Sequence, residues 1–268
     1  MKLSRGVLGL PLLMLAFAVL LTKKSEREPI LLLQKGQLLE RSDNPLEAAR
    51  AYDSLVARYP GTPAACRALW ALASMEYSVL QDTEKAVSRL HNLMDSCPGD
   101  PLAGEAMMML ADIHEIDLRD LEQSNQLRRE YFELVSNSAR SNEALFKIGD
   151  VLFKQGRYLE AQTTLEHLLE LEPEEEIATQ ANLRIGAILQ VGQDYDRSIR
   201  YFETVIAQSQ SPEFRLQAHL GLIESYEFLD KLSQALEVAR DIRPDEFAPE
   251  LKNDILMRLN RKKLHLER

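Results

Sequence analysis

The sequence is poor in the residues that mark disulfide-rich proteins, β-sheet proteins and flexible linkers. Its 268 residues include two cysteines, one tryptophan, 11 glycines and 11 prolines. Two cysteines cannot build a disulfide framework or a four-cysteine zinc site. Alternating runs of Val, Ile and Thr between turn dipeptides, which would indicate strands, are not evident. With 45% hydrophobic residues the chain can still bury a large core, and the sequence therefore predicts an all-α fold.

Motifs that carry catalytic or metal chemistry are missing as well. His114 and Glu115 resemble the start of a His-Glu-x-x-His zinc site, but Leu118 stands where the second histidine should be. There is no Cys-x-x-Cys pair, no glycine-rich phosphate loop and no Gly-x-Ser-x-Gly turn. One acidic cluster lacks the glycine and alternating oxygen ligands of a calcium loop: Asp112, Glu115, Asp117, Asp120 and Glu122. We therefore expect no enzyme activity, no cofactor and no metal.

The sequence does contain one pattern of small residues, large residues and prolines that is repeated six times. It is clearest at Gly149, Ala161 and Pro173, which are spaced by 12 residues. Small residues let two helices approach closely, and a large residue four positions later lies on the same buried face. Proline ends the second helix because it lacks an N–H donor and clashes with the preceding turn. The small residues on which this prediction depends are Gly36, Ala48, Ser74, Ala86, Gly149, Ala161, Gly186 and Ser198.

These residues resemble the tetratricopeptide repeat, a helix-turn-helix unit of about 34 residues with the order Trp, Leu, Gly, Tyr, Ala, Phe and Pro. The resemblance covers nearly everything from about Pro29 to Ile242. It implies a right-handed superhelix, or α-solenoid, of about six helical hairpins over residues 29–247, followed by a basic capping helix over residues 248–268. The spacing of 38 residues from Pro60 to Pro98 is similar to that of periplasmic members of the family.

The third repeat fits the pattern least well. Its first helix is expected around Met107, Leu110 and Ala111, but the partner helix from Leu121 to Val135 lacks the small residue on schedule. We therefore expect a lengthened helix or turn in this repeat.

The N-terminal segment, residues 1–28, differs from the rest of the chain. Lys2 and Arg5 precede a stretch from Gly6 to Thr22 that contains no charged residue. A membrane-spanning helix needs roughly 17 to 25 apolar residues, so this stretch is either an uncleaved transmembrane anchor or a signal peptide cut near Ala18. We favour the anchor, because the apolar run continues beyond the cleavage context. No cysteine follows it, which excludes a bacterial lipoprotein.

The topology of an anchored protein is left open by two opposing signals. Lys23 and Lys24 flank the far side of the apolar stretch, which favours a cytoplasmic body. Cys66 and Cys97 are expected at the same end of the second hairpin, where they would form either a disulfide or two separate thiols. A disulfide would favour an oxidising compartment such as the bacterial periplasm.

Charge is segregated along the chain. Residues 1–28 carry a net charge of +3 and residues 252–268 carry +4, whereas the residues between them carry −17. An acidic body is not expected to bind nucleic acid. The basic C-terminal end is predicted to be the solvated face of the capping helix, or else to contact anionic lipid near the anchor.

In this architecture the first helix of each hairpin lines a concave surface that is free to bind a protein partner. Helical phase places apolar and charged side chains together there. The concave-face candidates are Met75, Met108, Met109, Phe146, Lys147, Asp150, Phe153, Lys154, Arg184, Gln190 and Phe228. Chaperone-tail-binding members use a Lys and an Asn where this chain has Leu33 and Gln37, so that specificity is not expected.

The resemblance thus implies a membrane-anchored scaffold that binds proteins in a bacterial cell-envelope complex. The alternative is a cytoplasm-facing, membrane-bound adaptor or regulator with the same fold. The sequence predicts neither the partner nor the oligomeric state.

Overall fold

The computed structural model describes residues 27–135, 139–243 and 249–266, and every regular element in these ranges is a helix. The chain divides into two compact units, which meet in sequence between Asp120 and Leu121. The predicted all-helical fold is therefore confirmed for the described residues. The predicted anchor, Gly6 to Thr22, lies outside them.

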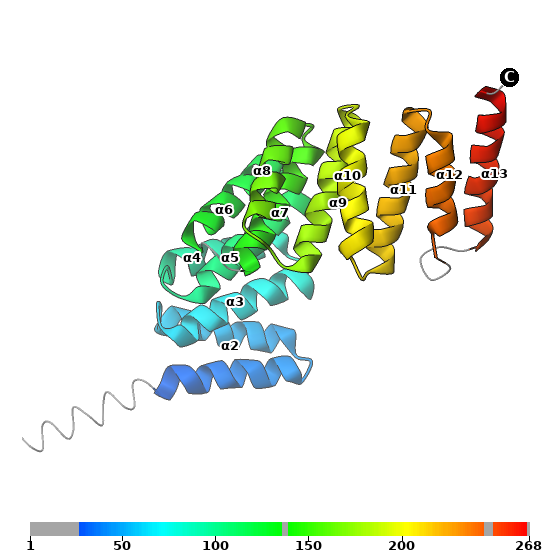
Figure 1. Cartoon of the computed structure of the whole chain (residues 1–268). Helices are drawn as coiled ribbons and strands as arrows, with labels where there is room; N and C mark the ends of the chain where they lie inside the picture. Colours follow the sequence, from blue (N-terminus) through cyan, green and yellow to red (C-terminus); the bar gives the residue numbers. More distant parts are fainter. Residues whose placement is uncertain (1–26, 136–138, 244–248, 267–268) are drawn as a thin grey trace, which may run out of the picture. The chain divides into compact units, whose positions relative to one another are not determined.

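Unit 1 is a stack of antiparallel helices (Figure 1). A first helix over residues 27–41 is followed by α2 (Pro45–Arg58), α3 (Pro63–Ser78), α4 (Thr83–Ser96) and α5 (Pro101–Ile116). Its core is a cluster in which Tyr52 and Leu55 of α2 pack against Leu33 and Leu72. Besides its neighbours in sequence, α3 also contacts α5, so the first helices of successive hairpins lie together.

Unit 2 continues the same pattern over eight helices. They are α6 (Leu121–Leu134), α7 (Ala139–Lys154), α8 (Tyr158–Glu170), α9 (Glu175–Val191), α10 (Tyr195–Gln208), α11 (Pro212–Phe228), α12 (Leu232–Asp241) and α13 (Pro249–Leu266). Each packs on the next one, and α9 also contacts α7 and α11. The third predicted hairpin consists of α5 and α6, and the boundary between the two units falls between these helices.

Prolines set the limits of many helices. Pro45, Pro63, Pro101 and Pro212 stand in the first turn of their helices, where the missing N–H donor has no intrahelical partner to lose. Pro60, Pro98 and Pro173 each lie two or three residues after a second helix has ended. The prolines therefore mark the turns of the hairpins as the sequence predicts.

The small residues of the second helices are fully buried at helix crossings. Ala48, Ala86, Ala161 and Ala235 have 0% exposure. In α6 this place is taken by Ser124, which is also 0% exposed. The expectation that the third repeat lacks a small residue is wrong, because serine is small enough to serve. Its two helices also have ordinary lengths of 16 and 14 residues.

The C-terminal helix α13 closes unit 2. Its Leu259 is fully buried in a cluster with Ile223, Leu236 and Ile242. On the same side, Arg258 pairs with Glu227 of α11 at 2.7 Å and Lys262 pairs with the same carboxylate at 3.7 Å. The helix therefore covers the apolar face of α12, as expected of a cap.

Candidate functional site

A single stripe of side chains runs along the first helix of each hairpin. It consists of the residues three before, one after and four after the small residue at the helix crossing. This spacing places the three side chains on one face of a helix. Around Gly186 these are Leu183, Ala187 and Gln190, and all three line one groove. Around Gly36 the three residues are Leu33, Gln37 and Glu40, and they line a second groove.

The larger groove lies in unit 2 and has a volume of about 570 Å³. It is formed by α7, α9, α10 and α11, and it is lined by Phe146, Asp150, Gln180, Leu183, Arg184, Ala187, Gln190, Phe202, Phe214, Gln217, Leu220, Gly221 and Glu224. Leu220 is 38% exposed although it is apolar. Exposed apolar side chains beside polar ones are typical of a surface that binds another molecule.

The floor of this groove is shaped by two glycines. The ring of Phe202 in α10 lies between Gly186 of α9 and Gly221 of α11. A Cβ atom at Gly186 would stand 2.6 Å from the ring, and one at Gly221 would stand 2.5 Å from it. Both distances are shorter than carbon atoms tolerate, so only glycine allows the ring to fill this space.

One edge of the groove is ionic. Asp150 is 8% exposed. It forms ion pairs with Lys154 of its own helix, at 2.9 Å, and with Arg184 of α9. The guanidinium of Arg184 also lies over the ring of Phe153, 4.8 Å from its centre, which is a favourable cation–π distance. The carboxylate thus fixes the arginine in place between two hairpins.

Three side-chain amides add further polar groups to the groove. Gln190 donates from Nε2 to the carbonyl oxygen of Gly221 at 2.9 Å and to the hydroxyl of Ser225 at 3.0 Å. Gln180 and Gln217 also line the groove. An amide both donates and accepts hydrogen bonds, as a peptide group does. These glutamines therefore suit the backbone of an extended chain.

A second groove, of about 550 Å³, lies in unit 1. Residues 27–41, α2, α3 and the start of α5 form it, and the lining residues are Leu33, Gln37, Glu40, Tyr52, Arg67, Trp70, Ala71, Asp100, Pro101 and Leu102. The Tyr52 hydroxyl donates to Glu40 at 2.9 Å. Burial, followed by this hydrogen bond, raises the pKa of Tyr52, so the phenol remains a donor. The sequence pattern did not select Trp70, because it indicates Ser74 as the small residue of α3, whereas in the structure Ala73, three residues after Trp70, is the fully buried one.

The structure brings together only part of the predicted concave face. Phe146, Asp150, Arg184 and Gln190 line the unit-2 groove, and Phe153 and Lys154 contact Arg184 and Asp150. Lys147 is half-buried but is not among the lining residues.

The remaining candidates lie elsewhere. Met75 is 4% exposed and belongs to the core of unit 1, so it is not on a binding surface. Met108 and Met109 are half-buried in α5, also in unit 1. Phe228 is 60% exposed and stacks on Tyr195 at a centroid distance of 4.9 Å, outside the groove.

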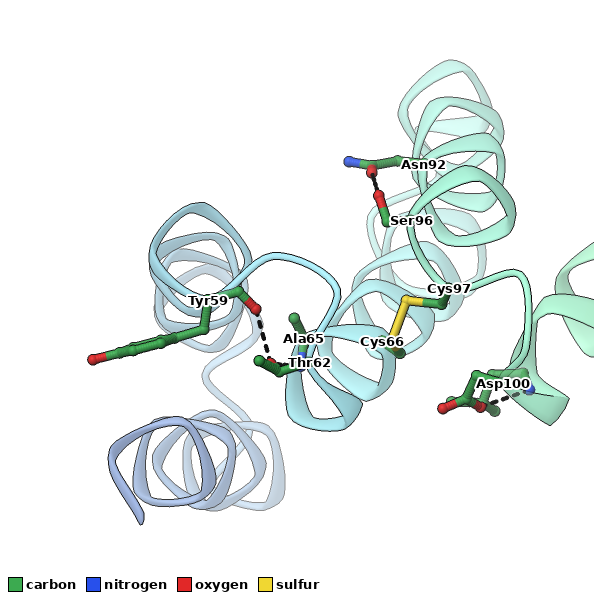
Figure 2. The surroundings of a disulfide bond; sticks show 9 residues. Tyr59, Thr62, Ala65, Cys66, Asn92, Ser96, Cys97 and Asp100 are labelled. Carbon is green, nitrogen blue, oxygen red and sulfur yellow. Dashed lines mark hydrogen bonds between the residues drawn. A yellow bond between two sulfur atoms is a disulfide. The ribbon is translucent and has the colours of Figure 1, made fainter. Parts of the chain in front are cut away.

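Cys66 and Cys97 are joined by a disulfide, with Cα atoms 6.2 Å apart (Figure 2). Cys66 lies in the first turns of α3, and Cys97 is the residue that ends α4. The amide of Asp100 donates to the carbonyl oxygen of Cys97 at 3.0 Å. The bridge therefore holds the turn before α5, which forms one wall of the unit-1 groove, against α3.

Two features are absent from the part of the chain that the structure describes. No group of three or more acidic, histidine or cysteine side chains is arranged there to hold a metal ion. None of its helices has the length and apolar character that a membrane crossing needs.

Two segments of the chain match family models that are both described as tetratricopeptide repeats. They are residues 33–90, from the first described helix into α4, and residues 143–175, across α7 and α8. Both segments are therefore similar to tetratricopeptide repeats. The second matched segment supplies Phe146 and Asp150 to the unit-2 groove.

Solved structures share the fold across most of the chain. The C-terminal part of a tetratricopeptide repeat protein from Cytophaga hutchinsonii is 13% identical and has a TM-score of 0.69, with 90% of this chain and 94% of that chain covered. PilF from Pseudomonas aeruginosa is 12% identical, with a TM-score of 0.56 and coverage of 89% and 99%. YrrB, described as a tetratricopeptide repeat protein with an unusual peptide-binding site, is 16% identical, with a TM-score of 0.56 and coverage of 77% and 97%. No curated protein sequence matches the chain significantly.

Proposed function

We propose that this protein is a scaffold that binds a segment of a partner protein in the groove of unit 2. The observation that carries the proposal is the composition of that groove. Apolar side chains from three hairpins stand beside three glutamine amides and an immobilised arginine. Tetratricopeptide repeat proteins generally mediate protein–protein interaction, and YrrB is described as having an unusual peptide-binding site.

The geometry favours an extended or helical segment with apolar side chains. Phe214 and Leu220 of α11 face the groove together with Phe146 of α7 and Leu183 of α9, so a guest contacts several hairpins at once. Burying apolar side chains in such a groove supplies most of the affinity, and the amides fix the direction of the chain. Glu224 forms no ion pair with the described residues and is available to a cation of the partner.

The place of action proposed is the envelope of a bacterial cell. Two observations support it: the apolar stretch from Gly6 to Thr22, which is long enough to anchor the chain, and the disulfide between Cys66 and Cys97. Disulfides persist in oxidising compartments, so the repeats are proposed to face the periplasm and to serve the assembly or maintenance of an envelope complex. Reporter fusions to the C-terminus separate this topology from that of a cytoplasm-facing adaptor.

The test of the groove uses photo-crosslinking in the cells that naturally make the protein. p-Benzoylphenylalanine replaces Leu220 in the groove or, as the control, Leu159 of α8, which is 77% exposed and lies outside the groove. We expect one or a few defined crosslinked partners from position 220 and none of these from position 159. Crosslinks of equal pattern from both positions, or partners seen from position 159 alone, would show that binding occurs elsewhere.

A further inference from the structure

The outward face of the first described helix, residues 27–41, differs from an ordinary solvated helix face. Ile30, Leu31 and Leu38 are 51%, 62% and 65% exposed. Arg27, Lys35 and Arg41 are exposed beside them. These six residues recur at intervals of three, four, seven and eight positions, so they share one side of the helix. We refer to them as the outer face.

The carboxylates of this helix are turned to its other side. Glu40 accepts the hydroxyl of Tyr52 in α2 at 2.9 Å. Partial burial together with the hydrogen bond and charge of Glu28 raises the pKa of Tyr59, also in α2. The three cations of the outer face, in contrast, form no ion pair with any residue that the structure describes. The outer face therefore combines uncovered apolar side chains with unneutralised positive charge.

We infer that the outer face lies on an anionic lipid surface. A helix with leucine and isoleucine next to lysine and arginine is the pattern that binds in the plane of a membrane interface. Anionic lipids attract such cations, each contributing about 1 kcal/mol near the surface. The inference rests on the proposed anchor, because Thr22 and Arg27 are five residues apart and so at most about 18 Å apart in a fully extended chain. The helix is therefore held close to the headgroups.

A second copy of the chain fits this face less well. Pairing two outer faces would bring Arg27, Lys35 and Arg41 close to the same cations of the other copy. Three apolar side chains also fall short of the roughly 800 Å² that each partner buries in a stable interface.

The inference is tested with the full-length protein carrying a nitroxide spin label at Leu38→Cys, since the two native cysteines are joined to each other. The control label is at Ala57→Cys, an exposed residue of α2 outside the outer face. Both proteins are reconstituted into vesicles of phosphatidylcholine alone and of phosphatidylcholine with phosphatidylglycerol. The measurement is the accessibility of each label to oxygen and to a water-soluble nickel chelate.

We expect the label at position 38 to be shielded from the nickel chelate and accessible to oxygen only when phosphatidylglycerol is present, and the label at position 57 to stay accessible to the chelate. Replacing Arg27, Lys35 and Arg41 by Glu should lower the equilibrium constant for binding of the outer face to the surface by about a hundredfold or more, from the contribution of about 1 kcal/mol per cation. The inference is overturned if both positions are equally shielded or if position 38 is not shielded. It is also overturned if the shielding vanishes when the protein is diluted, because that result indicates contact with a second copy.

Failure of the anchor is recognised separately, by extraction of the protein from native membranes with alkaline carbonate. If carbonate releases it, flotation of the protein with added vesicles decides the inference. Flotation that requires both phosphatidylglycerol and the three cations supports lipid binding by the outer face. If the protein does not float with these vesicles, the inference is overturned.

Discussion

Phe202 shows how single residues shape the unit-2 groove. The ring comes from α10, and it can reach the floor only because α9 and α11 each present a glycine to it. Gly186 follows from the repeat pattern, whereas Gly221 has no counterpart among the small residues predicted for the sixth repeat. The packing of the aromatic ring between two neighbouring hairpins explains why that position must be glycine.

Replacing Gly221 by Ala is expected to push the ring of Phe202 out of place. Overpacking of this kind costs about 1 to 3 kcal/mol of unfolding free energy, to be measured by urea denaturation. The crosslinks from position 220 should also weaken, since the groove floor moves. Gly99→Ala is the control, because a Cβ atom there meets nothing within 4 Å. Equal losses in the two variants would show that the ring does not occupy this place.

His114 gives unit 1 a dependence on pH. Burial, partly offset by the charge of Asp120, lowers the pKa of this histidine. Between the ordinary pKa of histidine and the lowered pKa of His114, the unfolded chain binds a proton that the folded chain does not. The free energy of unfolding is therefore highest above the ordinary pKa and falls as the pH drops from that pKa toward the lowered one. The free energy of unfolding should therefore fall less between about pH 7.5 and 5.5 in His114→Gln than in the natural protein. The exposed His265→Gln variant should keep the natural pH dependence.

Residue spacing predicted most of the fold, but only four of the residues that line the unit-2 groove: Phe146, Asp150, Arg184 and Gln190. In α3, α7 and α9 the position two after the buried small residue (Ala73, Gly149 and Gly186) is itself buried: Met75, Val151 and Ile188 are at most 4% exposed.

The sequence indicates Ser74 as the small residue of α3, which places Met75 one position after it on the concave face. In the structure Ala73 is fully buried and Ser74 is half-buried, so the register of this helix is shifted by one residue. Counted from Ala73, the stripe three before, one after and four after the small residue contains Trp70, and counted from Gly36 it contains Leu33.

Some features do not follow from spacing at all. Arg128 stands four residues after Ser124, where Tyr52, Leu90, Leu165 and Phe202 stand in other repeats, and it is fully buried. It donates to the Ser124 hydroxyl at 2.7 Å. A pattern that expects a large apolar residue cannot anticipate an arginine whose charge is accommodated by polar neighbours in the folded protein.

At the scale of elements, the hairpin of α3 and α4 is the one that is covalently closed. Its two cysteines are 31 positions apart, and their placement at one end of the hairpin follows from the antiparallel arrangement that the sequence predicts. That they are bonded could not be derived from spacing, because two thiols at the same positions would fit the repeat equally well.

Replacing both Cys66 and Cys97 by Ser is expected to lower the unfolding free energy of unit 1 by about 3 to 4 kcal/mol, from the loop entropy of a closure of this length. The measurement is urea denaturation with and without a reducing agent, which should affect the natural protein and leave the variant unchanged. Mass spectrometry of protein from cells with blocked thiols extends the test to the compartment. Two freely alkylated cysteines there would contradict the proposed periplasmic location.

At the scale of the whole molecule, the two ends of the chain are basic and the repeats between them are acidic. The net charge of −17 between residues 28 and 252 repels anionic surfaces. The N-terminal cations, in contrast, are attracted to such surfaces. This charge distribution agrees with the proposed contact between the outer face and anionic lipid.

Deleting residues 1–24 is expected to release a soluble protein whose melting temperature is unchanged, because the described core begins after this segment. The natural protein should sediment with membranes and resist extraction with alkaline carbonate. A mature N-terminus near Val19, found by mass spectrometry, would instead identify the segment as a cleaved signal peptide.

The chain has a single tryptophan, and it lies in the groove of unit 1. Trp70 is only half-buried, so a guest that covers it changes the polarity around the indole. Its ultraviolet emission therefore reports the occupancy of this groove without any added label. Unit 2 contains no tryptophan, so a partner confined to its groove leaves that emission unaltered. A shift in this emission during a titration therefore identifies binding in the unit-1 groove.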